Sequence, residues 1–261
     1  MPFDLPRLYE TGCLARIEHH DELGSTSDHA LKLAAQDDLE LPLLVVAERQ
    51  TAGRGRGANR WWAADGALTF SLVIQPPPAQ LPPANWPRLS LAAGLAICQA
   101  LEAFAPQALF QVKWPNDVYA EGRKIAGILI ESPAQSRGRL VIGIGINVNN
   151  SLKAAPDDIR SRATSLCDLD ARARDLTSVL STVLSELDVH LRAAADMASI
   201  RGRWQERCLL TGCTVQVQSG TETIAGRCLG IDEQGGLVLQ TETGRRSVVS
   251  GTVVDWESRF R

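Results

Sequence analysis

A loop rich in glycine and arginine, at residues 53–60, most constrains what this chain can fold into. Strand-like apolar runs at residues 43–47 and 67–74 precede and follow the loop, so two strands are expected to hold its ends. Its glycines let backbone N–H groups converge on an anion, and its arginines suit forked contacts to phosphate or carboxylate oxygens. It is not a P-loop, because no Gly-Lys-Ser/Thr follows. The loop therefore predicts an anion site; a solvated basic surface loop is the alternative.

A proline interrupts a second strand-like region. Pro115 requires an edge, a bulge or a strand end. The polar residues after it, Asn116 and Asp117, then need buried partners or a ligand, unless the segment is an ordinary turn. Lys124 is followed by Ile125, Gly127 and Leu129 at alternate positions, as in a strand, so its ammonium can face a cleft along the sheet. A solvated lysine is the alternative. With Lys113, these residues predict phosphate chemistry on a small ligand.

Composition limits the other classes of function. The chain has 261 residues, 44% of them hydrophobic, and a net charge of −3, so a sizeable core is available and no bulk charge drives binding to nucleic acid or membrane. The six cysteines form no CxxC pair, and the four histidines show no zinc-ligand spacing, which argues against a metal cluster built on them. The N-terminus lacks a signal-peptide pattern. We expect free thiols and a cytoplasmic location.

The pattern of elements changes along the chain. Ser25 and Asp28 are typical of a helix N-terminus, helices are expected at residues 89–104, 176–195 and 200–208, and strands at 124–131 and 140–148. After Thr211, short β runs predict a small barrel, at residues 214–218, 223–229, 236–241 and 246–249. We therefore place a boundary between residues 1–209 and 210–261. Gly143-Ile144-Gly145 lacks the third glycine and the crossover helix of a dinucleotide fingerprint.

Together, the glycine–arginine loop and the Lys113–Asp117 and Lys124 segments resemble the signature motifs of biotin protein ligases. The resemblance extends from about Gly24 to the end of the chain. It implies an α+β fold: a mixed sheet flanked by helices, of the class II synthetase-like type, followed by a small SH3-like β-barrel. It also implies the activity of a biotin–[acetyl-CoA-carboxylase] ligase.

The resemblance assigns roles residue by residue. It implies that Lys124 and Arg56 are catalytic and that Asp117 is a candidate Mg²⁺ ligand. The implied biotin-binding residues are Ser25, Thr26, Ser27, Gln50, Gly53, Arg54, Gly55, Arg56, Lys124 and Gly127. The implied nucleotide-binding residues are Arg56, Asn59, Trp61, Lys113, Asn116, Asp117 and Asn147. The chain departs from the pattern at Asn59, where many bacterial members carry a second arginine; Arg60 is a candidate for the missing charge.

The implied reaction uses ATP with Mg²⁺ and has two steps. Biotin is activated as biotinyl-5′-AMP, and a lysine of a biotin carboxyl carrier protein then accepts the biotinyl group. Only 24 residues precede Ser25, too few for the winged-helix domain of about sixty residues in repressor members. We therefore expect no repressor function, no DNA binding and no membrane association. A homodimer is possible, with residues 140–148 as a candidate edge strand.

Two alternatives remain open. A lipoate ligase or octanoyltransferase shares the core fold, but the transferases use a cysteine–lysine pair and no cysteine lies near Lys124 in the sequence. A nucleic-acid-binding regulator would use the C-terminal barrel, where Arg245, Arg246 and residues 259–261 supply charge. That barrel lacks the aromatic stripe typical of stacking surfaces.

Overall fold

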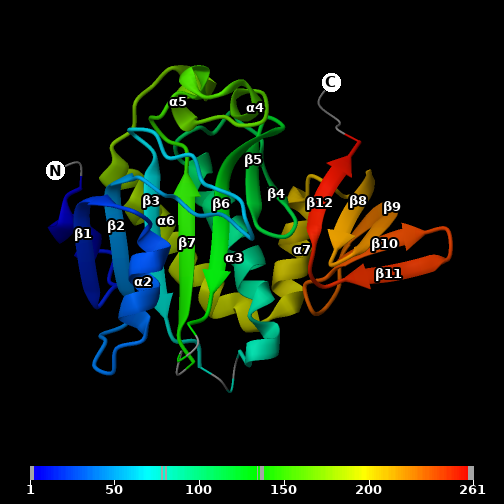
Figure 1. Cartoon of the computed structure of the whole chain (residues 1–261), viewed down its shortest axis with the longest axis horizontal. Helices are drawn as coiled ribbons and strands as arrows, with labels where there is room; N and C mark the ends of the chain where they lie inside the picture. Colours follow the sequence, from blue (N-terminus) through cyan, green and yellow to red (C-terminus); the bar gives the residue numbers. More distant parts are fainter. Residues whose placement is uncertain (1–2, 78, 80, 134, 136–137, 258–261) are drawn as a thin grey trace.

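Two β-sheets and the helices around them make up the molecule (Figure 1). The structure is a computed structural model, and it describes residues 3–77, 79, 81–133, 135 and 138–257. The larger sheet lies in the N-terminal part of the chain, and the smaller sheet packs beside it at the C-terminal end. The expected mixed sheet flanked by helices is confirmed.

The larger sheet has seven strands in the order β1-β2-β3-β7-β6-β5-β4. β1 and β2 are parallel, and every other neighbouring pair is antiparallel. The strands are β1 (Arg16–Leu23), β2 (Leu43–Gln50), β3 (Leu68–Ile74), β4 (Phe110–Lys113), β5 (Asp117–Ala120), β6 (Arg123–Glu131) and β7 (Leu140–Ile146).

β7 occupies the middle of this sheet, paired with β3 and β6. All its residues are buried, because both edges are hydrogen-bonded and both faces are covered. The expectation of an edge strand at residues 140–148 is therefore wrong. The edges are β1 and β4.

The two faces of the larger sheet carry different residues. On one face, large apolar side chains such as Phe70, Ile142 and Ile146 pack against α3 (Pro87–Glu102) and α6 (Leu176–Arg192). On the other face, Val45, Val73 and Val141 pack against α2 (Thr26–Ala34). Beyond the valines, towards the N-terminus of α2, this second face carries small residues: Thr69, Ser71, Gly127, Gly143 and Gly145. The change in side-chain size leaves space above the sheet, next to the start of α2.

The helices begin where the sequence supplies caps. Ser25 caps α2 and accepts a hydrogen bond from the Asp28 N–H, as predicted. Asp175 caps α6, and Asp196 caps α7 (Met197–Arg207). The shorter helices are α1 (Leu5–Tyr9), α4 (Asp157–Arg160) and α5 (Leu166–Asp170), with 3₁₀ turns η1 (Pro83–Asn85), η2 (Leu152–Ala154) and η3 (Ala193–Ala195).

The smaller sheet is antiparallel, with five strands in the order β11-β10-β9-β8-β12. Its strands are β8 (Thr214–Ser219), β9 (Glu222–Ile231), β10 (Leu237–Thr241), β11 (Gly244–Val248) and β12 (Thr252–Trp256). Four of these runs were predicted, and β12 was missed. Among the described residues β11 and β12 do not pair, so the expected barrel is an open sheet here. Its apolar face joins the main core beside Trp204 of α7. The boundary between residues 209 and 210 stays a prediction.

All six cysteines are free thiols. In the part of the chain that the structure describes, no helix has both the length and the apolar character needed to cross a membrane.

Candidate active site

A cavity of about 320 Å³ opens where the small-residue face of the larger sheet meets the smaller sheet. Four regions of the chain surround it: the start of α2 with the end of β2, the glycine–arginine loop, the strands β4 to β7, and β12. Among the predicted site residues, all but Gly53 and Asn147 line this cavity. The lining residues are Ser25, Thr26, Ser27, Gln50, Arg54, Gly55, Arg56, Asn59, Arg60, Trp61, Lys113, Trp114, Pro115, Asn116, Asp117, Lys124, Gly127, Ile128, Leu129, Gly143, Ile144, Gly145, Thr252 and Val253.

One end of the cavity is lined by neutral hydrogen-bonding groups. The Gln50 side-chain oxygen accepts from the Thr26 N–H at 2.7 Å and from the Thr26 hydroxyl at 3.1 Å. Ser71 donates to the Thr26 hydroxyl at 2.9 Å, and its own hydroxyl lies 3.2 Å from that of Ser27. These side chains are held in place by one another, so this end presents fixed, neutral hydrogen-bonding groups.

Glycines form the floor of the cavity. A Cβ at Gly143 would lie 2.2 Å from the Ser27 hydroxyl oxygen, and one at Gly145 would lie 2.4 Å from the Trp61 indole. A Cβ at Gly127, beside Gly145 on the neighbouring strand, would contact the same indole at 3.4 Å. The sequence analysis missed Gly143 and Gly145, although their alternation in a strand was noticed. In the structure, this alternation of glycines leaves one face of β7 free of side chains.

The glycine–arginine loop folds as a small hairpin. Its backbone hydrogen bonds run from the Trp61 N–H to the Gly53 carbonyl at 3.0 Å and from the Gly55 N–H to the Asn59 carbonyl at 2.8 Å. Gly53 lies behind Trp61, where a Cβ would come within 2.7 Å of the Trp61 carbonyl oxygen. The Asn59 amide donates to the Arg56 carbonyl at 2.9 Å. Asn59 thus stabilises the turn of the loop itself.

Two arginines of the loop have different surroundings. Arg54 donates to Asp28 and to Glu131, each at 2.6 Å, and the hydrogen bond to Glu131 contributes most to raising the pKa of Arg54. Arg56 donates to the Gly251 carbonyl and, at 3.0 Å, to the Thr252 hydroxyl. The ion pairs formed by the described residues do not include Arg56. Arg54 therefore ties the loop to α2 and β6, whereas the charge of Arg56 is available for an anion.

Two lysines and one carboxylate lie at the other end of the cavity. The Lys124 ammonium lies 2.6 Å from the Asp117 carboxylate and 5.9 Å from the centroid of the Trp61 ring. Lys113 and Asp117 face each other across the β4–β5 pair. The Lys113 ammonium lies 3.7 Å from the centroid of the Trp256 ring. Burial lowers the pKa of Lys113 to about 8, although Asp117 acts in the opposite direction.

The smaller sheet contributes residues that the sequence analysis did not find. Thr252 and Val253 of β12 line the cavity, and Trp256 of the same strand covers Lys113. The β4–β5 turn is also tied to this sheet, because the Trp114 indole donates to the Gly235 carbonyl at 3.1 Å. β12 was not predicted as a strand, so nothing in the sequence placed its residues at the site.

Asn116 and Asn147 have partners within the protein. The Asn116 amide donates to the Ile128 carbonyl at 2.7 Å and so joins the β4–β5 turn to β6. Asn147 is buried behind the cavity, where its amide donates to the Thr164 carbonyl at 3.0 Å and its oxygen accepts from Asn150 at 2.9 Å. The structure therefore brings Asn116 to the site and leaves Asn147 outside its lining.

The cavity has no thiol among its described lining residues. A transferase that relies on a cysteine nucleophile needs one next to the reacting carbonyl. The arrangement instead combines a neutral polar end, a flat floor and an adjacent group of cations. It suits a small uncharged ring system that carries an acid, together with a polyphosphate.

Comparison with known proteins agrees with the chemistry of this cavity. The Biotin/lipoate A/B protein ligase family matches residues 22–149, and the Biotin protein ligase C terminal domain matches residues 212–254. The biotin--[acetyl-CoA-carboxylase] ligase of Mycobacterium tuberculosis is 36% identical over 239 residues, which cover 89% of this chain and 86% of that protein. The corresponding ligase of Paracoccus denitrificans is 33% identical, covering 88% of this chain and 96% of that protein.

A solved structure is similar over nearly the whole chain. The biotin protein ligase from Aquifex aeolicus in complex with biotin and ATP superposes with a TM-score of 0.80 at 30% sequence identity, covering 94% of this chain and 99% of that one. With its two domain matches, its relatives and its fold in agreement, this chain belongs to the biotin protein ligase family.

Proposed function

We propose that this chain is a biotin–[acetyl-CoA-carboxylase] ligase, which activates biotin as biotinyl-5′-AMP and transfers it to a lysine of a biotin carboxyl carrier protein. The observation that carries the proposal is the division of one cavity into two chemically different ends. Thr26, Ser27 and Gln50 supply neutral hydrogen-bonding groups, and Arg56, Lys113 and Lys124 supply positive charge. Biotin has a neutral ureido ring and an acidic tail, and ATP has a polyphosphate, so the two ends match the two substrates.

The biotin ring belongs at the neutral end. Its ureido group has donors and an acceptor, which the hydroxyls of Ser25, Thr26 and Ser27 and the Gln50 amide complement. The glycines of β7 make room for the Ser27 hydroxyl and the Trp61 indole, which border the ring's site. Arg54, Gly55 and Gly127 then border the valeryl chain and direct its carboxylate to Lys124.

The first step brings two anions together. The biotin carboxylate attacks the α-phosphate of ATP, the bond to the β-phosphate oxygen breaks, and pyrophosphate leaves. Positive groups placed where charge develops lower this barrier, and groups held in advance do so with little reorganisation. Lys124 lies at the charged end of the cavity beside Gly127 of the floor, so it is assigned to the carboxylate and α-phosphate. Arg56 and Lys113 are assigned to the phosphates.

Nucleotide contacts complete this end of the site. Trp61 has an indole that lies over the glycine floor, where it can stack on adenine. Asn59 and Asn116 border the same region of the cavity. Asn147 supports the backbone beneath it through Thr164 and Asn150.

Mg²⁺ fits the site with the triphosphate. Asp117 is the one acidic side chain among the described lining residues, and Mg²⁺ is commonly held by one or two carboxylates together with substrate phosphates. Asp117 would hold the ion, whose chemistry there is to neutralise charge on the phosphates. Asp117 is paired with Lys124, so arriving ligands must share or exchange that contact.

In the second step, the acceptor lysine amine attacks the acyl carbon of the mixed anhydride, and AMP leaves as the amide forms. The anhydride reacts with water, so the site must exclude solvent until the acceptor arrives. The hydrogen bonds from Arg56 to Gly251 and Thr252 join the loop to the smaller sheet on one side of the cavity. We place this reaction in the cytoplasm and expect no DNA or membrane partner; a homodimer is compatible with the fold.

The test is biotin-dependent ATP–pyrophosphate exchange on the purified chain, run in parallel with lipoate and octanoate. Exchange with biotin alone is expected. Exchange with lipoate and not with biotin would overturn the assignment of biotin as the substrate, while the fold assignment would stand. Transfer is tested next, with an apo carrier domain as acceptor and a variant lacking its target lysine as the control.

A further inference from the structure

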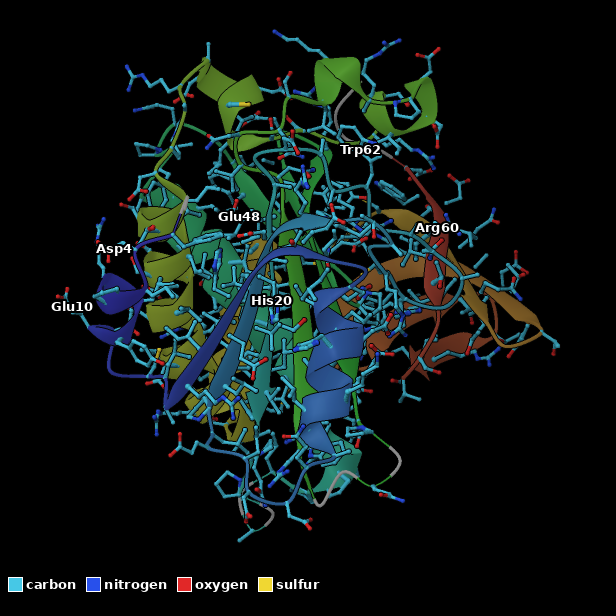
Figure 2. The ribbon with its side chains drawn as sticks, turned by 60° about the vertical axis from the view of Figure 1, so that its left-hand side comes forward. Asp4, Glu10, His20, Glu48, Arg60 and Trp62 are labelled. Atoms are coloured by element: carbon cyan, nitrogen blue, oxygen red, sulfur yellow. The ribbon has the colours of Figure 1, made fainter. Side chains whose placement is uncertain are left out.

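A cluster of two histidines and a glutamate lies outside the cavity, at the edge of the larger sheet. Glu18 and His20 are alternate residues of β1, so their side chains lie on the same face. His29 comes from α2, which crosses that face (Figure 1). Figure 2 labels His20 on β1 beside α2. One ligand atom from each of the three side chains lies within 4.8 Å of the other two.

The three side chains converge on one oxygen. Glu18 Oε2 lies 2.9 Å from His29 Nε2 and 3.7 Å from His20 Nε2. The two imidazole rings are 4.7 Å apart, edge to face. His20 Nε2 is shielded from solvent and makes no hydrogen bond to the described residues. The convergence of two imidazole nitrogens on one carboxylate oxygen is the feature that suggests a shared cation.

Arg16 orients the carboxylate. Its guanidinium donates to Glu18 Oε1 at 2.5 Å, so Oε2 is the oxygen that faces the imidazoles.

We propose that Glu18, His20 and His29 form a zinc site, with water as the fourth ligand. Two imidazole nitrogens and one carboxylate oxygen are a ligand set that favours Zn²⁺ over the oxygen-seeking Ca²⁺ and Mg²⁺. Zinc–ligand bonds of about 2.0–2.1 Å place tetrahedral ligands roughly 3.3 Å apart. The two distances from Glu18 Oε2, 2.9 Å to His29 Nε2 and 3.7 Å to His20 Nε2, lie on either side of that value.

The site is distinct from the catalytic cavity. None of the three ligands is among the residues described as lining that cavity. Zinc there would join β1 to α2, whose first turn carries Thr26 and Ser27. The expected effect is on stability, because a ligand that binds only the folded chain shifts the unfolding equilibrium by mass action.

The opposite face of β1 supplies a matched control. His19 lies there with Asp21 and Glu48, its Nε2 3.2 Å from a Glu48 oxygen. That group offers one imidazole and two carboxylates, a weaker set for zinc. His19 and His20 are neighbours in the sequence. His19→Gln therefore makes the same substitution on the same strand without removing a proposed zinc ligand.

The experiment measures zinc on the full chain, reduced and stripped with EDTA. Equilibrium dialysis with atomic absorption is expected to give one bound zinc per chain for the parent and for His19→Gln. Loss of that zinc is expected for His20→Gln and His29→Gln. Thermal melts should show a zinc-dependent rise in Tm of a few degrees in the parent that is absent from His20→Gln. Glu18→Gln, which keeps the side-chain shape, replaces either histidine variant that fails to fold.

Cobalt substitution separates this site from the cysteines. Co²⁺ bound to imidazole and carboxylate gives visible d–d absorption without the near-ultraviolet thiolate charge transfer that cysteine ligands produce. The proposal is overturned if the parent chain binds no stoichiometric zinc, if His20→Gln and His29→Gln retain it, or if the cobalt spectrum shows thiolate bands. Loss of zinc in His19→Gln alone would assign the metal to the other face and would also overturn it.

Discussion

The Lys124 ammonium and the Asp117 carboxylate form an ion pair of 2.6 Å at the charged end of the cavity. The two residues come from adjacent antiparallel strands, β6 and β5. Without ligands, Asp117 balances the charge of Lys124 and holds its side chain towards the cavity. An incoming carboxylate or phosphate competes for the same ammonium. The pair therefore holds the lysine in position before the substrates bind.

Lys124→Ala should abolish most of the adenylation. The expected loss in biotin-dependent ATP–pyrophosphate exchange is of the order of 10² to 10³, comparable to removing one preorganised charge donor from a transition state. Lys153→Ala, which removes an exposed lysine outside the cavity lining, is the control and should exchange normally. Near-normal exchange in Lys124→Ala would remove this residue from the mechanism.

Arg56→Gly should release biotinyl-AMP before transfer. The variant loses the hydrogen bonds to Gly251 and Thr252 together with the charge that faces the phosphates. Free adenylate in the supernatant, measured by chromatography after a single turnover, is expected to exceed that of the parent several-fold.

The control for loss of an arginine is Arg49→Gln. Arg49 precedes the same loop, is paired with Glu22 at 3.0 Å and lies outside the described lining. It should retain the adenylate as the parent does. Equal retention in Arg56→Gly would show that this arginine does not close the site.

Gly143→Ala should weaken biotin binding. The added methyl would lie 2.2 Å from the Ser27 hydroxyl oxygen, so α2 or the side chain must move. Overpacking of this kind costs about 1–3 kcal/mol, which corresponds to a rise of roughly 5- to 150-fold in the KM for biotin when the cost falls on the bound state. Gly202→Ala, with open space around its new methyl, is the matched control and should leave KM unchanged. An unaltered KM in Gly143→Ala would place the ring elsewhere.

The KM for ATP should rise with pH in a way that reports on Lys113. With a pKa of about 8, the lysine is charged below that pH and neutral above it, whereas an ordinary lysine would stay charged. Attraction for the triphosphate is therefore lost as the pH rises from about 7 to about 9, and KM is expected to increase by up to about tenfold. Initial-rate measurements across this range check the sign.

Two variants distinguish Lys113 from other titrating groups. Lys113→Gln should have a high KM for ATP that no longer changes near the pKa of the lysine. Trp256→Leu removes the ring 3.7 Å from the ammonium, which loses a cation–π contact but also admits water. Because burial contributes most to lowering the pKa of Lys113, the inflection should move to higher pH. An inflection that persists in Lys113→Gln would belong to another residue.

Much of the site was predictable because its signals are local. The glycine–arginine loop, the proline-interrupted strand and the Ser25 cap each depend on a few consecutive residues. The central strands and main helices followed from apolar runs and periodicity. Strand β1 was missed because its polar side chains, including His19, His20 and Asp21, hide the pattern of a strand. β12 was missed because it is short and half exposed.

The amino-acid sequence by itself determined which chemical groups the site contains and which stretches form its strands and helices, since propensity, capping and charge act between near neighbours. Tertiary structure alone decided how those groups are used. It paired Arg54 with acids and left Arg56 outside the ion pairs of the described residues. It brought Trp256 over Lys113, set Gly143 beneath Ser27, and gathered Glu18, His20 and His29. Each of these depends on contacts between distant segments, which only the folded packing creates.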